Sequence, residues 1–260
     1  MNLAYDRRGD GEPLLLLHGI GDRRQTWAPV LERLAAGLDV IAVDLPGFGD
    51  SPPLPEGMGY DLNGFCAALF DFCAGLGVRR PHVAGNSLGG LIALELGRRD
   101  VARTVTALSP AGFWNAVEIQ YAAAALRLTR AVARMSPRDL TRRLMGIRAG
   151  RTVMTGLIYG RPGDHDPADL LAGAAALAAA PGFEPTLRHS PEVRYRATIR
   201  VPVTIGWGTR DRLLPRWQAA RANRAVPGVH GVWLPGCGHV PMGDDPAMVA
   251  GVIRAAVARA

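Results

Sequence analysis

The chain has 260 residues, of which 48% are hydrophobic and 20% charged. That length and composition predict one folded domain, or a core with an insertion, and exclude a disordered chain and a small disulfide- or metal-stabilised fold. The formal net charge of +7 comes from arginine alone, and no paired Cys/His or stacked-aromatic motif accompanies it. A solvated, arginine-rich surface is therefore favoured over a nucleic-acid partner.

Targeting and redox signals are sparse. The first 13 residues contain no apolar segment of the signal-peptide type, and no apolar run reaches the roughly 18–20 residues that a membrane span needs. Cys66, Cys73 and Cys237 form no regular framework, which fits a reducing compartment. Cys66 and Cys73 are seven positions apart in a predicted helix, so both can face the core. We expect a cytoplasmic protein without a membrane span, monomeric or homodimeric, with a small-molecule substrate and no nucleic-acid partner.

Apolar runs of strand length and apolar residues at helical spacing alternate along most of the chain. Strands are predicted at 14–17, 40–43, 82–84, 105–108, 201–207 and 229–234, and helices at 27–36, 62–76, 88–99, 216–225 and 246–258. Strands that alternate with helices are typical of βαβ units. The pattern predicts an α/β fold with a mostly parallel, doubly wound sheet covered by helices on both faces.

One interval breaks this alternation. From Pro110 to Val201 the chain runs about three times the roughly 30 residues of a βαβ step. The excess is helical in composition, with Ala- and Leu-rich segments at 117–135, 137–145 and 169–180. We expect residues 113–196 to form a helical insertion, mounted on a core made of residues 1–112 and 197–260.

Ser87 is the first candidate for chemistry. It lies in the stretch GNSLGG at 85–90, between a predicted strand and a predicted helix. A serine on such a tight turn is held out from the sheet in a strained backbone, and glycines two positions before and after it remove side chains that would collide. The following helix directs free N–H groups and its positive end toward the serine. The stretch predicts Ser87 as a nucleophile.

A serine nucleophile needs a base, and the base needs an acid that orients it. Asp211 and His239 follow later predicted strands in the order that a Ser–acid–His triad requires. Alternatives exist for both residues: Asp211 could cap the helix that follows it, and His239 could be an ordinary core or surface histidine. Asp244 and Asp245 are closer to His239 in sequence, but they precede the last helix and are interpreted as its capping residues.

A pocket for a developing oxyanion is predicted at the stretch HGIG, residues 18–21, after the first apolar strand. The backbone N–H groups of Ile20 and Leu88 could converge on the oxygen of a tetrahedral intermediate. His18 is then expected to hold this loop rather than act as a base. The remaining histidines are interpreted as structural or solvated: His82, His165, His189 and His230. No spacing of residues in the sequence predicts a metal site.

With these residues in place, the chain resembles the α/β-hydrolase superfamily over nearly its full length. The resemblance rests on LLLLHGIG at 14–21, DLPGFGDS at 44–51, GNSLGG at 85–90, WGTRD at 207–211 and GCGHVP at 236–241. It is strongest to the single-cap members, which include esterases, haloperoxidase-like enzymes and carbon–carbon bond hydrolases. In that family a helical cap inserted after the sixth strand forms a lid over the nucleophile, which implies the same role for 113–196. The family's first strand is missing or very short here.

Departures from subfamilies narrow the chemistry that the resemblance implies. Dehalogenases and epoxide hydrolases carry Asp at the position of Ser87, and hydroxynitrile lyases use a lysine, which this chain lacks. Asn86 resembles the carbon–carbon hydrolases of aromatic degradation, but those place Trp where this chain has Val240. We therefore expect a serine hydrolase that cleaves a small carboxylic ester through an acyl-enzyme intermediate. The alternatives are a carbon–carbon bond hydrolase, a ligand-binding member without turnover, and a tailoring cyclase or thioesterase.

No cofactor is expected for this chemistry. Trp27, Phe113, Trp114 and Met242 adjoin the motif residues and could line an apolar substrate pocket or belong to the core. Residues 112–196 hold 12 Arg against 7 Asp plus Glu. Their spacing favours arginines on the solvated faces of amphipathic helices, which predicts that neutral esters are the better substrates. The alternative is that some arginines reach inward to an anionic substrate group, because a buried guanidinium needs a carboxylate or similar partner.

Overall fold

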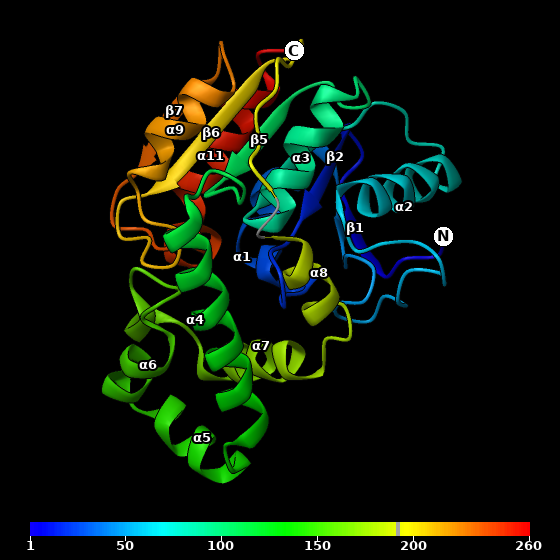
Figure 1. Ribbon diagram of the computed structural model, residues 1–260. Helices are drawn as coiled ribbons and strands as arrows, with labels where there is room; N and C mark the ends of the chain where they lie inside the picture. Colours follow the sequence, from blue (N-terminus) through cyan, green and yellow to red (C-terminus); the bar gives the residue numbers. More distant parts are fainter. Residues whose placement is uncertain (191–192) are drawn as a thin grey trace.

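The computed structural model describes residues 1–190 and 193–260, and these form a seven-stranded sheet between helices (Figure 1). The strand order is β1-β3-β2-β4-β5-β6-β7, and only β1 runs antiparallel to its neighbour. The strands are β1 (Tyr5–Arg8), β2 (Glu12–Leu17), β3 (Leu38–Val43), β4 (His82–Asn86), β5 (Val105–Leu108), β6 (Val203–Gly208) and β7 (His230–Leu234). The predicted α/β class and mostly parallel sheet are confirmed.

Strand β1 was not predicted. Its sequence, YDRR, has no buried alternation, and three of its four residues are exposed. It pairs with β3 at the edge of the sheet, where Tyr5 lies opposite Val43 and Arg8 opposite Val40. An edge strand gains backbone hydrogen bonds from its neighbour without burying its side chains, so hydrophobic patterning carries no signal for it.

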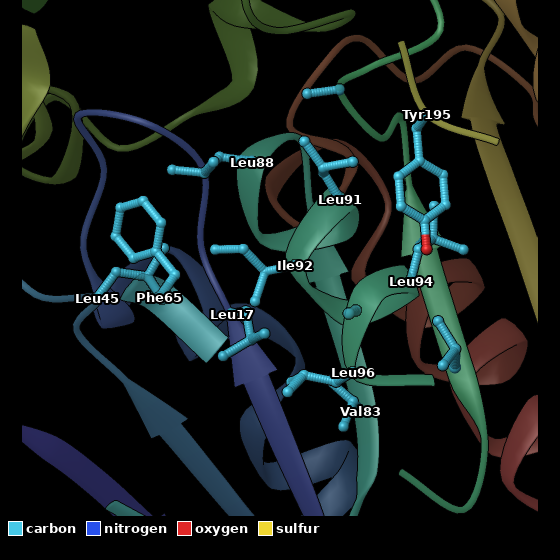
Figure 2. Close-up of a cluster of buried hydrophobic side chains, with 14 of the residues drawn as sticks. Leu17, Leu45, Phe65, Val83, Leu88, Leu91, Ile92, Leu94, Leu96 and Tyr195 are labelled. Carbon is cyan, nitrogen blue, oxygen red and sulfur yellow. The ribbon is translucent and has the colours of Figure 1, made fainter. Parts of the chain in front are cut away.

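Helices cover both faces of the sheet, as the alternating pattern predicted. Along β2, Leu14 and Leu16 pack into one buried cluster while Leu15 and Leu17 pack into the other, because successive side chains point to opposite faces. The first cluster lies under α1 (Ala28–Ala35) and α11 (Pro246–Val257). The second lies under α2 (Leu62–Gly75), α3 (Leu88–Arg98) and α9 (Gln218–Ala225). Figure 2 shows part of this second cluster around α3, with Phe65, Val83 and Ile92 among its members.

The helical interval lies between β5 and β6. It contains α4 (Ala116–Met135), α5 (Arg138–Gly146), α6 (Arg148–Thr155), the short 3-10 helix η2 (Pro162–Asp164), α7 (Pro167–Ala179) and α8 (Phe183–His189). In Figure 1, α4 leads away from the sheet, α5 and α6 lie at its far end, and α7 crosses between them and the core. The cap was expected after the sixth strand of the family, and the family's first strand was expected to be missing or very short. In the numbering used here the interval follows the fifth strand, β5.

Of these helices, α4, α5 and α7 were predicted, whereas α6 and α8 were not. Helix α6 is short, with Arg or Thr at half of its eight positions, and α8 contains Pro185. Proline is compatible with the first turn of a helix because the N–H groups there have no intrahelical partner. The start of α4 is specified locally, since Asn115 and Glu118 form a capping box.

Across the part of the chain that the structure describes, no single helix is long and apolar enough to cross a membrane, and only the bent pair α7–α8 meets the length and composition together. The same residues contain no cluster of three or more His, Cys, Asp or Glu side chains that could hold a metal ion. Two further short elements are η1 (Arg24–Trp27) and α10 (Pro241–Asp244).

Candidate active site

Ser87 occupies the turn between β4 and α3, as the motif predicted. Its φ of 55° lies in the left-handed region, which is a strained conformation for a residue with a side chain. A Cβ added to Gly85 would lie 2.1 Å from the carbonyl oxygen of Gly89, and one added to Gly89 would lie 2.2 Å from that of Leu17. These contacts explain both glycines, because no larger residue fits where the helix crosses the strand ends.

His239 and Asp211 are in contact, although 28 positions separate them. The Nδ1 atom of His239 lies 2.9 Å from Oδ2 of Asp211, and both side chains are buried. The other carboxylate oxygen, Oδ1, accepts hydrogen bonds from the backbone N–H groups of Leu213 at 3.0 Å and Leu214 at 2.8 Å. Asp211 therefore caps the following turn with one oxygen and faces the imidazole with the other, so the two interpretations of this residue are compatible.

The backbone of His239 is held from two sides. Its N–H donates to the carbonyl of Ile158, 2.7 Å away in the segment after α6. Its carbonyl accepts a hydrogen bond of 2.8 Å from the side-chain amide of Asn86. The same amide nitrogen donates to the carbonyl of Leu108 at 3.0 Å. Asn86 thus ties the loop that carries His239 to the ends of β4 and β5. The sequence singled out Asn86 only through its resemblance to the carbon–carbon hydrolases. Its hydrogen bonds to Leu108 and His239 could not be predicted, because they form only when separate strand ends pack together.

Two adjacent cavities meet at Ser87. The larger, of about 680 Å³, is lined by Ser87 and His239 from the core and by residues of α4, α5, α6 and α7. The smaller, of about 260 Å³, lies toward α3 and α8. Ile20, Ser87, Leu126 and Leu213 line both, and Leu88 lines the smaller one. Ser87 and the predicted oxyanion residue Ile20 therefore lie where the two cavities meet, and the other predicted oxyanion residue, Leu88, lies on the smaller cavity.

His18 has a structural position. Its Nε2 accepts the backbone N–H of Leu45 at 2.9 Å, and its Nδ1 lies 2.7 Å from the carbonyl oxygen of Gly19. Since a backbone N–H can only donate and a carbonyl can only accept, the ring is the neutral tautomer with its proton on Nδ1. Both ring nitrogens are occupied by backbone groups, as expected for a residue that holds the loop rather than one that takes a proton from substrate.

The predicted pocket residues need a correction. Trp27 and Met242 are fully buried in the core under α1 and α11, and neither lines the two cavities described above. Phe113 is also buried and packs edge-on against Tyr195, with ring centroids 6.0 Å apart. Of the four, only Trp114 lines a cavity, the smaller one. Proximity in sequence to a motif does not determine the face of the sheet on which a side chain lies.

Asp244 does not cap the last helix, so its interpretation as a capping residue was wrong. Asp245 does cap α11, because its Oδ1 accepts the N–H of Met248 at 3.0 Å. The fully buried carboxylate of Asp244 instead accepts the N–H groups of Gly160 at 2.8 Å, Arg161 at 2.8 Å and Gly238 at 2.7 Å. It therefore joins the segment after α6 to the loop immediately before His239.

Other groups complete the junction around Asp244. His165 places its Nε2 3.3 Å from Oδ1 of Asp244, and its ring lies against that of Tyr159 at a centroid distance of 3.9 Å. A Cβ added to Gly238 would lie 2.5 Å from the nitrogen of Gly160, so the two chain segments touch through their backbones. Burial alone would raise the pKa of Asp244, but hydrogen bonds from His165 and the backbone N–H groups lower it below its usual range.

We expect Asp244→Asn to destabilise the fold by about 1–3 kcal/mol at neutral pH, because the amide turns N–H groups toward backbone N–H groups that the carboxylate now satisfies. A carboxyl whose pKa is lower in the folded protein stabilises it above the unfolded-state pKa, and this contribution is lost as the pH falls through the folded-state pKa. Urea unfolding should therefore show the full difference from the unsubstituted protein near pH 7 and a smaller one in acid. Asp245→Asn, which alters only a cap, is the control. A difference that does not change with pH would contradict the assignment.

Cysteine chemistry is not supported at this site. Cys237 is only two positions from His239, but burial raises the pKa of its thiol to about 12. Burial likewise raises the pKa of Cys66 to about 12 and that of Cys73 to about 11. At these values the thiolate, which is the nucleophilic form, is scarce at neutral pH.

Comparison with known proteins shows the family of the chain. The family model described as "Alpha/beta hydrolase family" matches residues 14–252. An uncharacterized protein of Mycobacterium tuberculosis is 31% identical over 96% of this chain and 76% of its own length. A pimeloyl-[acyl-carrier protein] methyl ester esterase of Legionella pneumophila is 38% identical over 40% of this chain and 39% of its own. A crystal structure of a membrane phospholipase A aligns with a TM-score of 0.77 and 26% identity, covering 98% of this chain and 82% of that one.

Proposed function

The chain belongs to the alpha/beta hydrolase family, and we propose that this hydrolase cleaves a small carboxylic ester through an acyl-enzyme intermediate. The observation that carries the proposal is the contact between His239 and Asp211, together with the position of His239 and Ser87 in the wall of the same, larger cavity. In this assignment Ser87 is the nucleophile, His239 the general base and Asp211 the acid that orients the imidazole.

The proposed reaction has two halves. The Ser87 hydroxyl oxygen attacks the ester carbonyl carbon while its proton passes to Nε2 of His239. The N–H groups of Ile20 and Leu88 stabilise the negative charge on the carbonyl oxygen. The tetrahedral intermediate then expels the alcohol, which takes the proton from His239. A water molecule, deprotonated by His239, releases the acid and restores the Ser87 hydroxyl.

Asp211 is suited to its part because its orientation is fixed before substrate binds. Two backbone N–H groups hold Oδ1, so Oδ2 is left to face Nδ1 of His239. A carboxylate in that position holds the proton on Nδ1, leaves Nε2 free to accept the proton of Ser87, and stabilises the imidazolium that forms. The expected triad order along the chain, Ser87 then Asp211 then His239, is compatible with this arrangement.

The two cavities offer separate space for the two parts of the ester. One cavity would take the acyl part and the other the alcohol part, since Ser87 lines both. We also propose that residues 113–196, of which 191 and 192 lie outside the described residues, act as a cap on a core made of 1–112 and 197–260. The walls that α4, α5, α6 and α7 contribute to the larger cavity support that role.

A fluorophosphonate probe and a substrate panel test the proposal. The probe should label Ser87 alone, and p-nitrophenyl esters of increasing acyl length should be hydrolysed with burst kinetics if deacylation is slow. A vinylogous diketone, assayed beside the esters, tests for a carbon–carbon bond hydrolase. The chain resembles those enzymes in having Asn86 directly before the nucleophile candidate. Turnover of the diketone without turnover of esters would replace the proposed reaction. Failure of both assays and of labelling would indicate a binding protein that kept the fold.

A further inference from the structure

The larger cavity extends far from Ser87. Leu126, on α4, lines both cavities and so lies near their junction at Ser87. Arg134 lines the same cavity eight positions later on the same helix, which corresponds to about 12 Å along the helix axis. Figure 1 shows α4 running from the sheet to α5, so this end of the cavity lies away from the core.

The wall between these two ends is largely apolar. The helices α4, α5 and α7 supply it with side chains such as Leu126, Val132, Met145, Leu171, Ala174 and Leu177. Asp22, two positions after the predicted oxyanion residue Ile20, also lines the cavity, and desolvation raises the pKa of its carboxyl. The cavity therefore suits an apolar chain, with polar groups near each end.

Three arginines line the far end. Arg134 lies in the last turn of α4, and Arg138 and Arg142 come from α5; all three are exposed. We refer to them as the arginine cluster. Arg142 is paired with Asp139 at 2.8 Å, whereas Arg134 and Arg138 have neither a hydrogen bond nor an ion pair to any residue that the structure describes. The inserted helices contribute one acidic residue to the cavity lining, Asp169 on α7. The three arginines therefore outnumber it.

Neighbouring arginines have protein partners instead. Arg130 donates to the carbonyl groups of Leu177 and Ala180, and Arg127 pairs with Glu184 at 3.3 Å. The insertion thus contains arginines that stabilise its own packing, whereas Arg134 and Arg138 line the cavity without such a partner among the described residues. The sequence favoured arginines on the solvated faces of the helices. The three arginines of the cluster are exposed, as that predicts, but they also line the cavity.

Helix electrostatics single out Arg138. It is the first residue of α5, at the end where backbone N–H groups are unpaired and the partial charge is positive. A cation is unfavourable at that end, although Asp139 in the same turn offsets part of the effect. An anion beside Arg138 would interact favourably with the guanidinium groups of Arg134 and Arg138 and with the helix end together.

We propose that the arginine cluster binds an anionic group, a carboxylate or a phosphate, at the far end of an apolar chain whose ester lies at Ser87. The inference rests on the proposed function and names its substrate class. It reverses the expectation that neutral esters are the better substrates. Arginine suits this role because its planar fork can form two parallel hydrogen bonds to one carboxylate or phosphate.

Matched substrates test the inference. We would compare p-nitrophenyl monoesters of dicarboxylic acids of increasing length with their methyl-capped analogues, and with analogues that end in phosphate. The kcat/KM ratio of charged to capped substrate should rise with chain length to at least tenfold, and should fall with added salt because exposed charges are screened over about 8–10 Å. A higher ratio for the phosphate than for the carboxylate series, or the reverse, identifies the anion.

Variants locate the effect. In the double variant Arg134→Gln/Arg138→Gln the charged-to-capped ratio should fall to near one. Arg143→Gln, on the same short helix but outside the cavity lining, should keep the ratio and the activity of the unsubstituted protein. A ratio near one in the unsubstituted protein at every length, or a high ratio that survives in the double variant, would overturn the inference.

A binding assay separates this inference from the proposed function. Calorimetry with a long-chain dicarboxylic monoester on Ser87→Ala should show binding that the double arginine substitution weakens at least tenfold. If neither ester series is hydrolysed and the fluorophosphonate does not label Ser87, the proposed function fails, and the calorimetry still decides whether the cluster binds anions. If neutral esters are hydrolysed and the calorimetry shows no dependence on the cluster, only the present inference fails.

Discussion

Ser87→Ala is expected to lower kcat for ester hydrolysis by about 10⁶-fold, because a triad acts as a unit and removal of its nucleophile leaves only binding and oxyanion stabilisation. The fold should persist. The backbone N–H of Ser87 donates to Leu108, and its carbonyl accepts from Leu91 and Ala111, and none of these bonds involves the hydroxyl. The measurement is single-turnover hydrolysis of a p-nitrophenyl ester, with circular dichroism as the check on folding.

Ser109→Ala is the matched control for this prediction. Ser109 is also buried, also follows a strand directly and also has a positive φ, of 42°. Its hydroxyl accepts a long hydrogen bond of 3.4 Å from the N–H of Gly208. We expect this variant to keep its activity within about tenfold and to retain fluorophosphonate labelling. Labelling of Ser109 or Ser51 with Ser87 unmodified would disprove the assignment of the nucleophile.

Asp211→Asn is expected to lower kcat by about 10⁴-fold with little change in fold. The N–H groups of Leu213 and Leu214 require an acceptor, so the amide oxygen of the asparagine should take the place of Oδ1. Its NH₂ group must then face Nδ1 of His239, which becomes the acceptor, and the imidazole proton moves to Nε2. That tautomer cannot take a proton from Ser87. Steady-state kinetics on the best ester of the panel, together with thermal unfolding, measure both parts.

Asp44 and Asp245 are the other carboxylates to compare. Asp44 is buried beside Arg24, which donates to it from both its backbone and its side chain, and Asp245 caps α11. Substitution of either by Asn should act mainly on stability. If Asp211→Asn cost less than about tenfold in kcat while Asp44→Asn or Asp245→Asn abolished turnover of a folded enzyme, the orienting acid would be a different residue.

The predicted strand–turn–helix around Ser87 was confirmed because its cause is local. The glycines at 85 and 89 are required by backbone contacts within a few residues and with the adjacent strand, and an apolar run before them and a helical pattern after them are visible in the sequence. The same holds for β2 and β3, whose continuous apolar runs are typical of strands buried on both faces. Strand β1 could not be recognised, because its stability comes from pairing with β3.

Side-chain partners across the fold were harder to predict. Asp244 and Asp245 are adjacent residues of the same type before the same helix, yet one caps that helix and the other binds a segment 83 to 84 positions earlier. For Trp27 and Trp114 the sequence left open a place in the pocket or in the core, and the structure places Trp27 in the core and Trp114 in a cavity wall. Spacing along the chain contains no information on which distant backbone N–H groups will surround a carboxylate.

The sequence by itself determined the fold class, the turn at Ser87, and the order of Ser87, Asp211 and His239, because hydrophobic periodicity and glycine sterics act over a few residues. Only the tertiary structure decided that His239 faces Asp211, that Asn86 and Asp244 hold the loop around His239, and that Arg134 and Arg138 share a cavity with Ser87. These contacts join residues that are far apart in the chain. They exist only once the sheet has brought its strand ends together and the inserted helices have packed over them.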